Sequence, residues 1–227
     1  MYSKLFEPIT MKKTITLLTL ILLAGFSFAQ EESEDGMKTL IKKNTKFGGF
    51  MGLTVKLSDV HDSNTILVGG TMGALFNDNF MFGFGGYGIS SSSRFDGKRF
   101  ATSPTTEPMY LYGGYGGLIL GYKLMPNEII HISFPVLIGG GEFEVSHIKN
   151  SDVDNINFGD IVDQSSALVV EPAVEAEINV TKFFRIAVGG SYRVVQGLSM
   201  NEQLNNITDE SMTSWATHIS LKFGKFW

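Results

Sequence analysis

From residue 47 to the end of the chain, apolar and polar residues alternate with a period of two, which is the pattern of half-buried β-strands. The clearest case is the last sixteen residues, from Met212 to Trp227. One face of this run carries Trp215, Thr217, Ile219, Leu221, Phe223 and Trp227, and the other carries Ala216, His218, Ser220, Lys222 and Gly224. Because edge strands of soluble sheets are normally blunted or covered, this run is predicted to close a barrel by pairing with the first strand.

Seven further runs show the same alternation. With the last run, the predicted strands are residues 47–57, 66–76, 80–90, 109–123, 129–145, 168–178, 184–193 and 212–227. In the fifth run the alternation changes phase at Gly139-Gly140-Gly141, which predicts a β-bulge there.

The connections between these runs differ in length in a regular way. Short turns at 77–79, 125–127 and 181–182 follow the even strands, and polar stretches at 91–108, 147–164 and 196–210 follow three of the odd ones. An even number of strands with alternately short and long connections is typical of outer-membrane barrels. We therefore predict an all-β protein, an antiparallel up-and-down eight-stranded transmembrane β-barrel.

The alternative fold is a secreted, soluble β-sandwich, which also has alternating strands. Aromatic residues at the ends of the apolar faces favour the barrel, because they match the interfacial girdles of membrane barrels. The predicted girdle consists of Tyr110, Tyr122, Phe184, Tyr192 and Trp215.

The start of the chain has the features of an export signal. Lys12 and Lys13 precede an apolar run from Ile15 to Phe28, and small residues stand before a predicted cleavage site after Ala29. A transmembrane helix is disfavoured because about 15 apolar residues fall short of the roughly 20 needed to span a membrane. The predicted organisation is a signal peptide at 1–29, with Met11 as an alternative initiator, a periplasmic lead at 30–45 and the barrel at 46–227.

Composition narrows the function further. Charged residues make up 18% of the chain, and the net charge of −5 comes without a basic cluster, which excludes a nucleic-acid-binding surface. The absence of cysteine excludes disulfides, thiolate metal sites and a lipid-modified amino-terminal cysteine.

The strand pattern over residues 46–227 resembles the small eight-stranded outer-membrane barrels of the OmpA/OmpX type of Gram-negative bacteria. The resemblance implies location in the outer membrane with both termini in the periplasm, and contact with outer-membrane lipid and lipopolysaccharide. It also implies recognition by the barrel-assembly machinery through the final strand. The residues assigned to this assembly signal are Ile219, Leu221, Phe223 and Trp227.

If the apolar faces meet lipid, a set of charged residues must face the barrel interior. This predicted cluster comprises Glu171, Glu175, Glu177, Arg185, Arg193, His218 and Lys222, with Lys56 and His131 on the same face of their strands. An eight-stranded barrel is filled by side chains, and unpaired buried charges are costly. Two registers pair the cluster, with Glu177 opposite Arg185 or Glu171 opposite Arg193. Either register gives the cluster a structural role, and the alternative is a proton relay or ligand site.

A hydrolytic site is the main enzymatic alternative. His131 and Ser133 form a His-x-Ser pair, followed on the same run by Glu142 and Glu144, which resembles the lipid A deacylase barrels. Along an unbroken strand, however, Glu142 lies roughly 30 Å from Ser133 at about 3.4 Å per residue. We therefore expect no catalytic residues.

Two loops carry weaker signals. Asp152, Asp154, Asn155, Asn157 and Asp160 gather oxygen ligands suited to calcium, but without the spacing of a helix-loop-helix site, so no metal or cofactor is expected. Arg94, Lys98 and Arg99 are candidates for contacts with lipopolysaccharide phosphates.

Taken together, these features predict a monomeric, non-enzymatic barrel with a structural or adhesive surface role. A lipid A-modifying enzyme or export-accessory barrel is the first alternative. A narrow, porin-like pore is the second.

Overall fold

The computed structural model describes residues 45–61, 63–90, 93–147, 161–201 and 203–226. The predicted signal peptide and all but Thr45 of the predicted lead lie outside the described residues. The elements are β1 (Phe47–Val60), β2 (Ser63–Phe76), β3 (Phe80–Ile89), β4 (Ser93–Gly97), β5 (Glu107–Leu124), β6 (Ile130–Ser146), β7 (Ile161–Asn179), β8 (Phe184–Gln196), α2 (Asp209–Met212) and β9 (Ser214–Gly224). Within these ranges no helix is long and apolar enough to cross a membrane.

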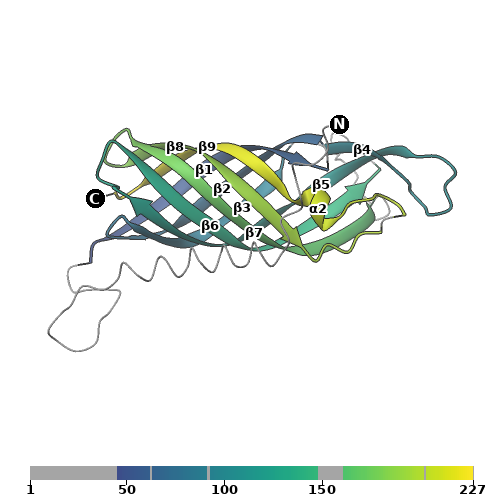
Figure 1. Ribbon diagram of the computed structural model, residues 1–227, viewed down its shortest axis with the longest axis horizontal. Coiled ribbons are helices and arrows are strands. Elements are labelled where there is room, and N and C mark those ends of the chain that lie inside the picture. Colours follow the sequence, from purple (N-terminus) through teal and green to yellow (C-terminus); the bar gives the residue numbers. More distant parts are fainter. Residues whose placement is uncertain (1–44, 62, 91–92, 148–160, 202, 227) are drawn as a thin grey trace, which may run out of the picture. The chain divides into compact units, whose positions relative to one another are not determined.

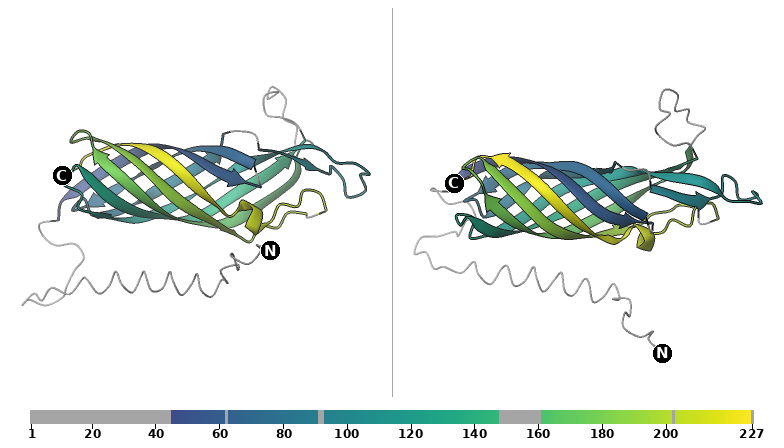
Figure 2. Two further views of the ribbon diagram at one scale, coloured as in Figure 1. Left: turned by 45° about the horizontal axis from the view of Figure 1, so that its top comes forward. Right: turned by 90° about the horizontal axis from the view of Figure 1, so that it is seen from above.

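The strand pairing joins eight of these strands into a closed antiparallel ring. The barrel is seen from different sides in Figures 1 and 2. Neighbours in sequence are paired around the ring, β3 pairs directly with β5, and β1 pairs with β9. The predicted barrel and its closure by the last strand are therefore confirmed. Closure also leaves neither β1 nor β9 with an open edge over the paired residues, such as Val55 opposite Ile219.

The two ends of the barrel differ. One end, called the turn end here, carries the short connections 77–79, 125–129 and 180–183 together with both ends of the described barrel chain. The opposite end, called the loop end, carries β4, α2 and the longer connections, and the β4–β5 hairpin projects beyond the rest of it (Figure 1).

The outer wall is apolar over most of its height. Side chains such as Leu53, Met72 and Phe84 are exposed there, whereas their sequence neighbours point inward. Aromatic pairs lie near both limits of this band. Phe184 stacks on Phe223 with ring centroids 4.8 Å apart, and Tyr192 contacts Trp215 at 4.7 Å.

The height of the apolar band fits a membrane. Trp215 and Phe223 are eight residues apart on β9, which at about 3.4 Å per residue corresponds to about 27 Å of strand. A strand tilt of about 40° reduces this to about 21 Å along the barrel axis, close to the apolar band of about 25 Å in transmembrane barrels.

The bulge predicted at Gly139-Gly140-Gly141 is wrong. β6 keeps one register with both neighbours through these glycines, and its irregularity lies between Val145 and Ser146. The apparent phase change has another cause: the strand keeps its orientation, but its apolar residues change from the outer to the inner side. Strands also extend further at the loop end than predicted, since β7 begins at Ile161 and β4 lies within a stretch predicted to be a loop.

Candidate functional site

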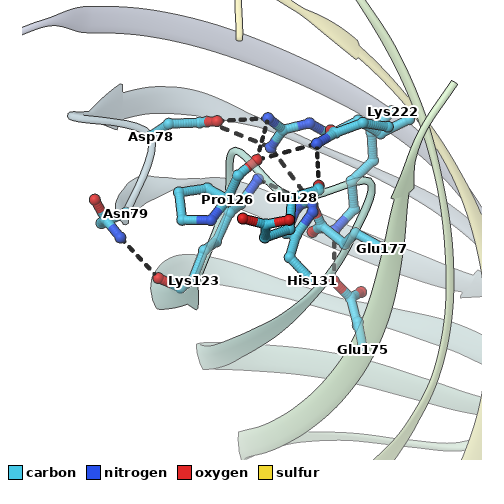
Figure 3. A network of polar contacts seen from close by, with 11 residues as sticks. Asp78, Asn79, Lys123, Pro126, Glu128, His131, Glu175, Glu177 and Lys222 are labelled. Atoms are coloured by element: carbon cyan, nitrogen blue, oxygen red, sulfur yellow. Dashed lines mark hydrogen bonds and ion pairs between the residues drawn. The ribbon is translucent and has the colours of Figure 1, made fainter. Parts of the chain in front are cut away.

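A network of buried charges fills the turn half of the barrel, with Glu177 at its centre (Figure 3). Glu177 is fully buried and accepts from Lys222 Nζ at 2.7 Å and from Lys123 Nζ at 3.1 Å. Its Oε2 also lies 2.9 Å from His131 Nε2. A carboxylate with this many partners is compensated in the interior, where an unpaired charge would be strongly unfavourable.

Glu175 extends the network one step along the inner face of β7. It lies 2.5 Å from Lys222 Nζ and 3.0 Å from His218 Nε2. Lys222 therefore bridges two carboxylates that belong to the same strand. Since Glu175 and Glu177 alternate with outward-facing Val174 and Ala176, the period of the strand is what brings both carboxylates to one lysine.

At the turn end a second ion pair closes the barrel. Arg185 contacts Asp78 with both terminal nitrogens, the shorter distance being 2.5 Å, and also lies 3.6 Å from Glu177. The ring of Phe226 covers this guanidinium, with 3.8 Å between Arg185 Cζ and the ring centroid. The penultimate residue thus folds over the interior charges.

Nearer the loop end, Glu171 holds a separate group. Its Oε1 accepts from Lys56 Nζ at 2.7 Å and its Oε2 from the Tyr115 hydroxyl at 2.6 Å, while Ser191 also donates to it. The Lys56 ammonium lies 3.4 Å from the centroid of the Tyr87 ring, a cation–π contact.

The two predicted pairings across the β7–β8 turn are resolved by the register. Asn179, not Glu177, lies opposite Arg185, so the first register is wrong. The same register places Glu171 opposite Arg193, because its neighbour Val170 pairs with Val194. Glu171 nevertheless forms its ion pair with Lys56, across the barrel. Arg193 instead donates to backbone oxygens, at 3.0 Å from Nε to Met212 and at 3.3 Å from Nη2 to Asp59.

Between Arg193 and the loop end, the interior of the barrel becomes apolar. Buried side chains from six strands and from the β8–β9 connection fill the loop end: Val60, Leu67, Met109, Leu111, Phe143, Val145, Val169, Val195, Met200, Ile207 and Met212. We call this set the loop-end core. Over the same height the outer face carries polar residues such as Glu142, Gln164 and Ser166.

The β8–β9 connection is folded into this core as a cap. Asp209 accepts hydrogen bonds from the backbone N–H groups of Gly197 and Leu198. Asp163 accepts from Asn201 N and from Asn205 Nδ2, and both of these distances are 2.7 Å. The Thr208 capping box starts α2, whose Met212 is fully buried. The interior is therefore covered by protein at the loop end as well as at the turn end.

Among the described residues, the β4–β5 hairpin projects beyond the other elements of the loop end (Figure 1). The backbone of Lys98 donates to Leu204 O at 2.7 Å, which fixes the hairpin to the cap. Near its tip, Phe100 is 62% exposed and lies 5.6 Å from the guanidinium of the exposed Arg99. Arg94 is also exposed, opposite Tyr110 on β5.

The structure places the predicted site residues as follows. The seven residues of the predicted charge cluster are all buried inside the barrel. Of the predicted girdle, Trp215 and Tyr122 are exposed, and Phe184 and Tyr192 are half-buried in aromatic pairs. The fifth residue, Tyr110, lies opposite Ser146 and therefore nearer the loop end than the exposed polar residues of β6. Ile219, Leu221 and Phe223 face outward, and Trp227 lies outside the described residues.

The residues considered for chemistry do not come together. His131 and Ser133 point into the interior, whereas Glu142 and Glu144 lie on the opposite face of β6. The oxygen-rich residues 152–160 lie outside the described ranges. In the part of the chain that is described, no three His, Asp or Glu side chains are grouped to hold a metal ion.

Four residues of the buried network were not predicted: Lys123, Asp78, Tyr87 and Tyr115. Lys123 follows outward-facing Tyr122, so parity alone could have placed it inside. Asp78 sits in the β2–β3 turn with a φ of 59°, and sequence alone gives no signal that its carboxylate folds inward.

Comparison with known proteins supports no assignment beyond the fold. No protein-family model and no curated protein sequence matches the chain. Among solved structures, the N-terminal β-barrel domain of Pseudomonas aeruginosa OprF is 9% identical, covering 78% of this chain and 96% of that one, with a TM-score of 0.47. Neisserial surface protein A is 8% identical, covering 82% of this chain and 100% of that one, with a TM-score of 0.46. The attachment invasion locus protein Ail of Yersinia pestis is 12% identical, covering 78% of this chain and 97% of that one, with a TM-score of 0.38.

Proposed function

We propose that this chain is an outer-membrane barrel that presents a fixed contact surface outside the cell, in a structural or adhesive role. The observation that carries the proposal is the change of polarity along the barrel. Apolar side chains cover the outer wall around the charged interior, whereas polar side chains such as Glu142 on β6 and Gln164 on β7 face outward beside the loop-end core. A wall that changes in this way suits a barrel that is embedded over part of its height and projects into water over the rest.

In this proposal the turn end faces the periplasm and the loop end faces outward. The short connections and the two ends of the barrel chain then lie on the side where transmembrane barrels have short turns. The candidate contact surface is the tip of the β4–β5 hairpin, where Arg99 and Phe100 are exposed. The proposed surroundings of the barrel are outer-membrane lipid and lipopolysaccharide. The basic residues Arg94, Lys98 and Arg99 lie near the polar head groups in this proposal. The protein acts as a monomer.

Orientation can be tested with two epitope insertions, one between Pro104 and Thr105 in the hairpin and one between Asn127 and Glu128 in a short turn. We expect antibody to label the hairpin insertion in intact cells and the turn insertion only after the outer membrane is permeabilised. The reverse labelling would overturn the orientation.

The contact role can be tested by shortening the hairpin. Cells that carry a variant with residues 98–106 replaced by Asn-Gly are expected to bind less to an anionic polysaccharide surface than cells with the intact protein. A second variant, Arg99→Ala with Phe100→Ala, leaves the hairpin backbone intact and is also expected to bind less, because it removes the exposed side chains of the tip. Binding equal to that of the parent in both variants, at equal outer-membrane levels, would contradict the role.

The two alternatives have less support. A pore requires a path through the interior, yet the loop-end core fills one end and Phe226 covers Arg185 at the other. Planar-bilayer recording is therefore expected to give no steady conductance. A lipid A-modifying enzyme requires Glu142 or Glu144 beside His131, and they occupy opposite faces. A lipid A mass spectrum unchanged by deletion would agree with a non-enzymatic barrel.

A further inference from the structure

The interior contains a cavity of about 30 Å³ among the buried charges, and its lining includes Lys56, Glu171, Glu175 and Lys222. One side is apolar and includes Ile119 and Leu137. The other side is polar and includes Thr54, His218 and Ser220. A cavity with such a wall differs from an apolar void, which stays dry.

His218 lines this cavity and carries an unpaired polar atom. Its Nε2 is 3.0 Å from Glu175, but its buried Nδ1 has no hydrogen-bond partner among the described residues. The nearby hydroxyls of Thr54 and Ser220 bond to each other at 2.8 Å, and each hydroxyl oxygen can accept a further hydrogen bond. Buried polar groups in folded proteins are nearly always paired with protein or with ordered water.

The size of the cavity restricts the occupant. One water molecule needs roughly 10–15 Å³ of cavity volume, so about 30 Å³ holds about two. An organic ligand is too large. Because this cavity lies between two barrel ends that are covered by protein, we expect its water to exchange slowly with solvent.

We propose that this cavity is an internal water-binding site, in which about two ordered water molecules complete the hydrogen bonding of His218 Nδ1 and of the Thr54 and Ser220 hydroxyls. The proposal concerns the interior and holds whether or not the surface role is correct. It implies that the polar half of the interior is hydrated while the loop-end core is dry.

The direct test is water–protein cross-relaxation NMR on the full isotope-labelled barrel in detergent micelles. We expect long-lived water signals at the His218 ring and at the β-carbon protons of Ser220. The matched reference is the Phe143 ring in the loop-end core, where we expect none. Assigned His218 and Ser220 signals without any water contact would overturn the proposal.

A cavity-filling variant gives a second test. Ala173 lines the cavity, so Ala173→Val should displace water and abolish the signal at His218. Its urea midpoint should not rise above that of Ala176→Val, which places the same side chain on the outer face of the same strand. A higher midpoint for Ala173→Val would mean that a dry void had been filled, and would contradict bound water. If Ala173→Val does not fold, the measurement on the unaltered protein still decides.

Discussion

The two halves of β6 show opposite arrangements on one strand. Near the turn end, Ile130 and Ile132 face outward while His131 and Ser133 are buried. Near the loop end, Glu142 and Glu144 face outward and Phe143 and Val145 are buried. The strand does not slip or bulge between these segments, because the register with β5 and β7 is continuous from Ser133 to Val145.

What changes between the two halves is the surroundings of the wall. In lipid, apolar side chains face out and charges must be paired within the barrel, whereas in water the same alternation buries apolar residues as a soluble core does. In the proposed orientation, the position where the polarity changes sides therefore corresponds to the outer boundary of the membrane. On β6 this position is the run Gly139-Gly140-Gly141.

The largest expected effect comes from breaking the charged half at its centre. In Glu177→Gln, Lys222, Lys123 and Arg185 lose a shared carboxylate in a buried site, and removal of one partner from such a pair costs about 3–5 kcal/mol. We expect the urea midpoint of the folded barrel, followed by its heat-modifiable gel mobility, to fall accordingly.

Glu142→Gln is the control for this change, since it removes the same charge from the exposed outer wall. Its free energy of unfolding should stay within about 0.5 kcal/mol of that of the parent. Equal stability of Glu177→Gln and the parent would show that the buried carboxylate does not support the fold.

The second effect tests the boundary itself. Ile219→Lys places a charge midway between Trp215 and Phe223 on the outer wall, which costs about 2–4 kcal/mol at the centre of a bilayer. Ser166→Lys also places a lysine on the outer wall, but beside Glu142 at the loop end, where the cost should be near zero. Unfolding in phospholipid vesicles measures both. Similar costs for the two variants would refute the assigned membrane boundary.

Much of this architecture follows from the sequence, because the period of a strand and the lengths of its connections are local properties. Lys222, Glu175 and His218 could be placed inside by parity alone, since the side-chain period of a strand is two. The same rule failed at Gly139-Gly140-Gly141. It assumed one environment outside the barrel, and a change of environment along a strand has the same sequence pattern as a bulge.

The partners of the buried charges could not be predicted. Lys56 lies on β1 and Glu171 on β7, and only the shape of the closed ring decides that their side chains meet across it. Likewise, Asp78 reaches Arg185 from a turn whose backbone adopts positive φ, so its side chain does not follow the parity of a strand.

The smallest expected effect concerns the turn end, where Phe226 covers Arg185. Phe226→Leu keeps an apolar side chain but removes the aromatic face, and a cation–π contact is worth about 0.5–2 kcal/mol depending on how far it is desolvated. We expect a small decrease in the urea midpoint.

Phe183→Leu is the matched control, because Phe183 is an exposed aromatic in the β7–β8 turn at the same end of the barrel. If both variants lost the same stability, membrane contact rather than the Arg185 guanidinium would explain the contribution of Phe226. A larger loss in Phe226→Leu would mean that the Phe226 ring stabilises the charged interior through Arg185.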